Sequence, residues 1–136
     1  MTSPKFKSQF REHKDSHILI VDDDETLLKF FKIHLNKFFS HVLIADNAKD
    51  AMDIIQNKNV SLVISDIKMP KVDGLELLSI IKKHDPTIPV YIVSGAPLDD
   101  SAMKKIDKTA DGFLKKPFSV DQIHSFISEG LKKTKM

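Results

Sequence analysis

The run Ile18-Leu19-Ile20-Val21, followed directly by Asp22-Asp23-Asp24, decides the fold class of this chain. Side chains alternate between the two faces of a strand, so four consecutive apolar residues predict a strand that is buried on both faces. Such strands are typical of a parallel sheet with helices on both sides. The three acids then lie just past the carboxyl end of that strand.

The same alternation continues along the chain. We expect four further strands, at His41–Ala45, Val60–Ser65, Ile88–Val93 and Gly112–Leu114. Apolar residues at helical spacing follow each strand, in the segments 27–38, 48–55, 75–81, 98–106 and 120–131. Five strands alternating with five helices predict an α/β fold of three layers, a doubly wound parallel sheet with helices on both faces.

Local signals support these elements. Asn47 and Ser119 are suited to cap the helices that follow them, and Asp24 is the acid best placed to cap the first one. Pro70 and Gly74 indicate a loop after the third strand. We expect one domain at 17–131, a flexible tail or short helix at 1–16, and a basic tail at 132–136.

Composition limits the function classes. The chain has 136 residues, 41% hydrophobic and 29% charged, with a net charge of +2. So small a net charge does not favour binding to nucleic acid or to an anionic membrane. There is no cysteine and no apolar run that could span a bilayer, so we expect a cytoplasmic protein.

Chemically active residues gather where strands end. Besides the first acids, these are Ser65-Asp66, Ser94-Gly95 and Lys115-Lys116-Pro117. The carboxyl ends of parallel strands form one edge of the sheet, where ligands of such folds bind. Carboxylates held close repel unless a cation joins them, and Mg²⁺ prefers oxygen ligands. Acids, a hydroxyl and an amine at one edge predict a site for phosphoryl transfer, with an Asp as acceptor.

These segments together resemble the receiver domains of two-component signalling. The matching motifs are Ile18 to Asp24, Val63 to Gly74, Val93-Ser94-Gly95 and Lys116-Pro117-Phe118, and the resemblance covers roughly residues 17–131. It implies a flavodoxin-like (βα)5 fold with strand order 2-1-3-4-5.

The resemblance also implies a role for each motif residue. Asp66 would accept the phosphoryl group. Asp22, Asp23 and Asp66 would hold Mg²⁺, or Mn²⁺ in its place, together with the backbone carbonyl of Lys68. Asp23 would be the more direct ligand, and Asp22 would act partly through water. Lys116 would pair with the phosphoryl oxygens.

Two further residues would act as a switch. By the same resemblance, Ser94 would donate its hydroxyl to the phosphoryl group and draw the following loop inward. Phe113 occupies the position of the switch aromatic, although a plain core role is an equally open interpretation. The Lys116-Pro117 bond is often cis in this family.

The expected function is therefore a phosphorylation-dependent switch. A histidine kinase or a histidine phosphotransfer protein would donate to Asp66. The surface of the last two helices and the strand Gly112–Leu114 would then change its binding to a downstream partner or to an output domain outside this chain. We expect a monomer or a phosphorylation-linked dimer, and no separate enzyme activity.

Two other functional classes use the same residues differently. A phosphatase-like hydrolase would use Asp66 as a nucleophile, but Ile67-Lys68 offers no second acid and no segment could form a substrate cap. A scaffold that binds partners without phosphorylation is disfavoured by the complete set of acids, acceptor and lysine.

The six histidines show no pair at metal-ligand spacing. His34 and His124 fall in predicted helices, but a phosphoacceptor histidine normally lies on an exposed helix of a bundle. We interpret all six as ordinary surface or half-buried residues.

Overall fold

The computed structural model describes residues 13–68, 73–95 and 97–134. Its centre is a parallel sheet of five strands in the order β2-β1-β3-β4-β5, which confirms the expected order. The strands are β1 (His17–Val21), β2 (His41–Ala45), β3 (Val60–Asp66), β4 (Val90–Ser94) and β5 (Gly112–Lys115). All neighbouring strands pair in parallel.

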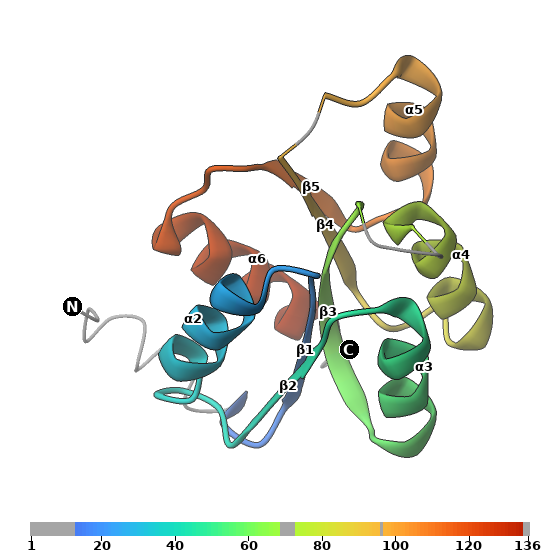
Figure 1. Ribbon diagram of the computed structural model, residues 1–136. Helices are drawn as coiled ribbons and strands as arrows, with labels where there is room; N and C mark the ends of the chain where they lie inside the picture. The colour runs from blue at the N-terminus through green and yellow to red at the C-terminus, as the bar shows by residue number, and fades with distance from the viewer. Residues whose placement is uncertain (1–12, 69–72, 96, 135–136) are drawn as a thin grey trace.

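Helices cover both faces of the sheet, as Figure 1 shows. They are α2 (Glu25–Leu35), α3 (Ala48–Asn57), α4 (Gly74–His84), α5 (Asp100–Thr109) and α6 (Val120–Thr134). Helices α2 and α6 pack on one face, and α3, α4 and α5 on the other. The predicted three-layer α/β architecture is confirmed. None of the helices in the described ranges is both long and apolar enough to cross a lipid bilayer.

The central strands divide their apolar side chains between the two faces. In β1, Ile18 and Ile20 join the core beneath α2 and α6, whereas Leu19 and Val21 join the core beneath α3, α4 and α5. All four side chains are at most 1% exposed. The unbroken apolar run in the sequence thus reflects burial on both faces.

Some boundaries differ from the expected ones. Helix α2 ends at Leu35, but the N–H of Phe38 donates to the carbonyl of Leu35, and this tight turn keeps the Phe38 side chain in the core. Strand β4 begins only at Val90, since Pro89 has no N–H for the sheet. Helix α5 begins after the cap Asp99, so Leu98 lies outside it. Helix α6 continues through Thr134, three residues beyond the boundary expected at Leu131.

Tyr91 of β4 occupies a slot beneath α6 that two glycines create. Its ring is fully buried and lies 4.7 Å from that of Phe126, centroid to centroid. A Cβ atom on Gly112 or on Gly130 would collide with the Tyr91 ring, and one on Gly130 would also collide with Leu62. Close packing here therefore depends on two residues that have no side chain.

Candidate functional site

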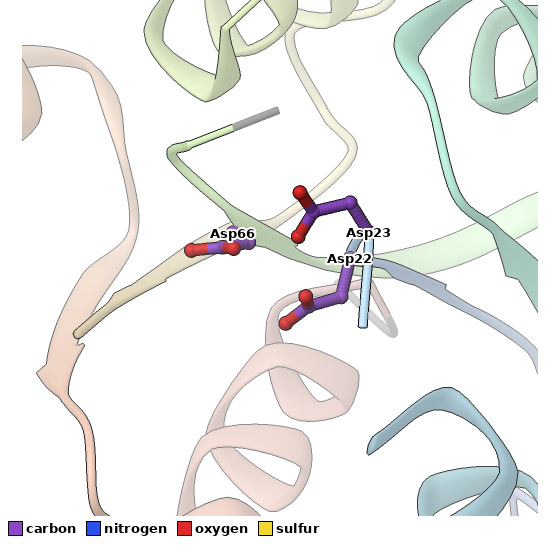
Figure 2. A group of neighbouring side chains, drawn as sticks. All are labelled: Asp22, Asp23 and Asp66. Carbon is purple, nitrogen blue, oxygen red and sulfur yellow. The ribbon is translucent and has the colours of Figure 1, made fainter. Parts of the chain in front are cut away.

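Three carboxylates meet at the carboxyl edge of the sheet, as expected from the sequence. Asp22 and Asp23 follow β1, and Asp66 is the last residue of β3. Strands β1 and β3 are neighbours in register, with Val21 beside Ser65. One carboxylate oxygen from each acid lies within 4.8 Å of the others, and Figure 2 shows the three side chains together. Asp22 and Asp66 are buried, whereas Asp23 is exposed.

Asp24, the next acid along the chain, has a different task. Its Oδ1 accepts hydrogen bonds from the N–H groups of Thr26 and Leu27, which makes it the N-cap of α2. Its own N–H donates to Oδ1 of Asp22 at 3.0 Å. The prediction that Asp24 caps the helix is confirmed, and the cap in turn helps to hold Asp22.

Lys116 approaches the acids from the end of β5, the outermost strand, which is separated from β3 by β4. Strand β5 pairs with β4, and its last residue, Lys115, lies beside Ser94, so Lys116 follows at the same edge. Its Nζ donates to Oδ2 of Asp22 at 2.9 Å and lies 3.6 Å from Oδ2 of Asp66. The Lys116-Pro117 bond is cis, and the Lys115 side chain is exposed.

The charges of this cluster influence one another. Burial raises the pKa of Asp66, and the nearby Asp22 raises it further, while Lys116 and a hydrogen bond from the N–H of Ile67 act in the opposite direction. Burial alone would lower the pKa of Lys116, but the hydrogen bond and charge of Asp22, followed by the charge of Asp66, raise it overall. The site is a charged amine held among carboxylates, one of which is destabilised as an anion.

Gly74 is a residue of this site whose contact was not anticipated. The sequence placed it at the end of a loop, and it is the first residue of α4, capped by Asp73. Its N–H donates to the carbonyl of Ile67 at 2.6 Å. A Cβ atom here would collide with the backbone of Asp66 and Ile67. Gly74 therefore lets α4 begin directly against the strand end that carries Asp66.

The remaining predicted residues lie around this cluster. Ser94 ends β4, is 1% exposed, and its carbonyl accepts the N–H of Lys116 at 2.8 Å. Phe113 of β5 is partly buried and packs on the core beneath α3, α4 and α5. Lys68 lies just past β3 with an exposed side chain. Pro70 lies outside the described residues. These positions are compatible with the expected roles, which remain predictions.

An open parallel sheet with acids and an amine at its carboxyl edge is typical of doubly wound α/β proteins, which bind their ligands at that edge. The family model for the response regulator receiver domain matches residues 18–128 of this chain. The chain belongs to that family, the receiver domains of two-component signalling, which confirms the resemblance seen in the sequence.

Individual proteins similar to this chain are also named as response regulators, transcriptional regulatory proteins or receiver domains. The transcriptional regulatory protein GlrR of Escherichia coli K12 is 31% identical over 90% of this chain, and an NtrX-like putative response regulator of Rickettsia typhi is 35% identical over 88%. The chain covers only 28% and 26% of these two proteins. A solved CheY-like receiver domain protein from Methanospirillum hungatei JF-1 has a TM-score of 0.82 and 30% identity, covering 89% of this chain and 97% of that one.

Proposed function

We propose that this chain is a phosphorylation switch in which Asp66 accepts the phosphoryl group. One observation carries the proposal: the Asp66 carboxylate lies within 4.8 Å of two further acids and 3.6 Å from the Lys116 amine. The amine would neutralise charge on the incoming group, and positioning with charge neutralisation is most of what phosphoryl transfer requires.

The donor is a phosphorylated histidine of a kinase or of a phosphotransfer protein. An Asp66 oxygen attacks phosphorus, an oxygen–phosphorus bond forms, and the phosphorus–nitrogen bond breaks. The imidazole leaves with the bonding electrons and takes up a proton. The product is an aspartyl phosphate, and no separate substrate is turned over.

The acids fit a hard divalent cation. Asp22, Asp23 and Asp66 supply carboxylate oxygens, and the backbone carbonyl of Lys68 would complete the protein ligands of Mg²⁺ or Mn²⁺. Such an ion, when bound, would offset the negative charge that gathers around the phosphoryl oxygens. Asp22 would then have less need of Lys116, which could turn toward the phosphoryl group.

The readout would use Ser94 and Phe113. Ser94 would donate its hydroxyl to the phosphoryl group, and Phe113 would change its packing as the loop after β4 follows. The surface of α5, β5 and α6 would thus favour a second state, a population shift driven by the better contacts of the phosphoryl group in that state.

The partners lie outside this chain. Since the chain covers about a quarter of the first curated relatives, we propose that residues 17–131 form the receiver and act on a downstream protein or on an output domain elsewhere. We propose a cytoplasmic location, and a monomer that could dimerise on phosphorylation.

The test is incubation with acetyl phosphate, with and without Mg²⁺, followed by intact mass. We expect a gain of one phosphoryl group with Mg²⁺ and none in Asp66→Ala. Asp53→Asn, which changes an exposed acid on α3, is the matched control and should behave like the unaltered chain. No gain under any condition, or a gain that survives Asp66→Ala, would overturn the proposal.

A further inference from the structure

Two histidines far apart in the sequence meet between α2 and α6. Nε2 of His34 lies 2.9 Å from Nε2 of His124. The ring planes differ by only 15° while the ring centroids are 5.1 Å apart, so the rings lie end to end rather than face to face. His124 is 1% exposed. The interpretation of all six histidines as surface or half-buried is therefore wrong for His124.

An end-to-end contact between two Nε2 atoms is a hydrogen bond, and it limits the number of protons that the two rings can carry. One neutral imidazole must donate its Nε2–H, and the other must accept with an unprotonated Nε2. A single extra proton can be taken up on Nδ1 of the donor ring, which leaves the bond intact. After a second proton both Nε2 atoms carry hydrogen, and the two charged rings cannot keep this contact.

The surroundings disfavour charge on either ring. The Phe38 ring lies edge-on to both imidazoles, 5.9 Å from His34 and 5.4 Å from His124, centroid to centroid. Among the described residues, charged side chains that act on the pair include Lys37, just after α2, and Asp121 in the first turn of α6. Lys37 lowers the pKa of His34, whereas Asp121 raises that of His124.

The pKa values agree with this geometry. Burial, and then Lys37, lower the pKa of His34 below its ordinary 6.5. Burial, and then the charge of His34, lower the pKa of His124 to about 4, against an opposing effect of Asp121. Both rings therefore resist protonation in the folded protein.

We propose that the His34–His124 pair is a proton-sensitive latch between α2 and α6, closed with at most one extra proton and open when both rings are charged. The latch lies at a small cavity of about 60 Å³, lined by Phe30, Phe31, His34, Phe118, Val120 and Ile123.

The latch also adjoins the segment that carries Lys116. The Phe31 ring of α2 lies 5.8 Å from the ring of Phe118, two residues beyond Lys116. Opening would therefore loosen the contacts that hold this segment on the side of α2. The latch rests on the contact of His34 with His124, and it holds or fails whether or not Asp66 is an acceptor.

The test is a pH titration of the unphosphorylated chain by nitrogen-15 NMR. At pH 7 we expect opposite tautomers for His34 and His124 and a measurable coupling between their Nε2 nuclei. On acidification from pH 6.5 to below 4 we expect this coupling to disappear while backbone signals of α2 and α6 shift together. Independent titration of both rings near 6.5, or the absence of the coupling at pH 7, would overturn the proposal.

Two variants separate a latch from general acid unfolding. In His124→Gln the amide can still bond to His34 but cannot become charged, so the joint shift of α2 and α6 should be lost. His84→Asn, which removes an exposed histidine at the end of α4, should keep it. If His124→Gln does not fold, His34→Gln takes its place, and the pKa of His124 should rise because the charge of its neighbour is gone. An unchanged joint shift in the glutamine variant would contradict the latch.

Discussion

Two polar clusters among the described residues are built in different ways. At the carboxyl edge of the sheet, Asp22, Asp66 and Lys116 come from the ends of three strands, and opposite charges attract. Between α2 and α6, His34 and His124 come from the sides of two helices, and like charges would repel. The first cluster holds charged groups, whereas the second stabilises neutral imidazoles. A buried polar group can thus be stabilised either by a partner charge or by staying neutral.

The largest expected effect comes from breaking the ion pair at the sheet edge. Without the amine of Lys116, the carboxylate of Asp22 would be buried without a partner charge. Because Lys116 itself is a quarter exposed, we expect Lys116→Ala to lower the free energy of unfolding by about 2–3 kcal/mol rather than by the larger loss of a fully buried pair. Urea denaturation without divalent cations measures it.

The neighbour in sequence provides the control for this prediction. Lys115→Ala removes an exposed amine of the same kind and should change stability by less than about 0.5 kcal/mol. Equal losses in the two variants would show that the edge cluster is not held by the Lys116 ion pair.

A smaller effect is expected where α4 meets the end of β3. In Gly74→Ala the new methyl group would press on the backbone of Asp66 and Ile67, so we expect a loss of about 1–3 kcal/mol from overpacking. In Gly95→Ala the nearest atoms, in the Lys116 side chain, are 3.6 Å away, which is an ordinary contact. Thermal unfolding of the two variants compares them, and a Gly95→Ala loss as large as that of Gly74→Ala would contradict the close approach.

The two clusters are expected to have opposite pH dependences. The unfolded chain takes up protons at histidine near pH 6.5 while His124 does not until about 4, so this cluster loses stability as pH falls across that window. Asp66 has a raised pKa, so the folded chain takes up its proton first, and the stability contributed by this group rises as pH falls toward 3.8. In the unaltered chain the two trends partly cancel.

Asp66→Asn should separate these trends. At pH 7 the neutral amide removes a buried charge that Asp22 repels, so the melting temperature should rise by a few degrees. Between pH 6.5 and 4 the variant should then lose stability more steeply than the unaltered chain. Melting curves at several pH values check both points, and a lower melting temperature at pH 7 would contradict the first.

The sheet edge could be predicted from the sequence because parallel pairing is a strong constraint. Once β1 and β3 are buried parallel strands, Asp22 and Asp66 must end at the same edge. The meeting of His34 and His124 could not be predicted in this way. It depends on how α2 and α6 are rotated and placed against each other, and this is set by the packing of rings such as Phe31 and Phe38.

The sequence pattern also missed two details of the backbone, for related reasons. The expectation that Pro70 and Gly74 bracket a loop did not show why a glycine is needed at 74, where its missing side chain lets α4 start against β3. The end of α2 was placed too late because Phe38 remains in the core after the helix has ended. Apolar spacing records which residues are buried, and it does not record how the backbone brings them there.

The slot around Tyr91 has a consequence for how this chain can change by mutation. Gly112 and Gly130 are separate in sequence, yet both are restricted by the same ring. A larger residue at Gly112 becomes tolerable only after Tyr91 is replaced by a smaller one, and a larger residue at Gly130 needs room from Leu62 as well. A smaller residue at 91 alone leaves a void. The three positions therefore form one epistatic unit, in which the order of substitutions determines whether each intermediate protein folds.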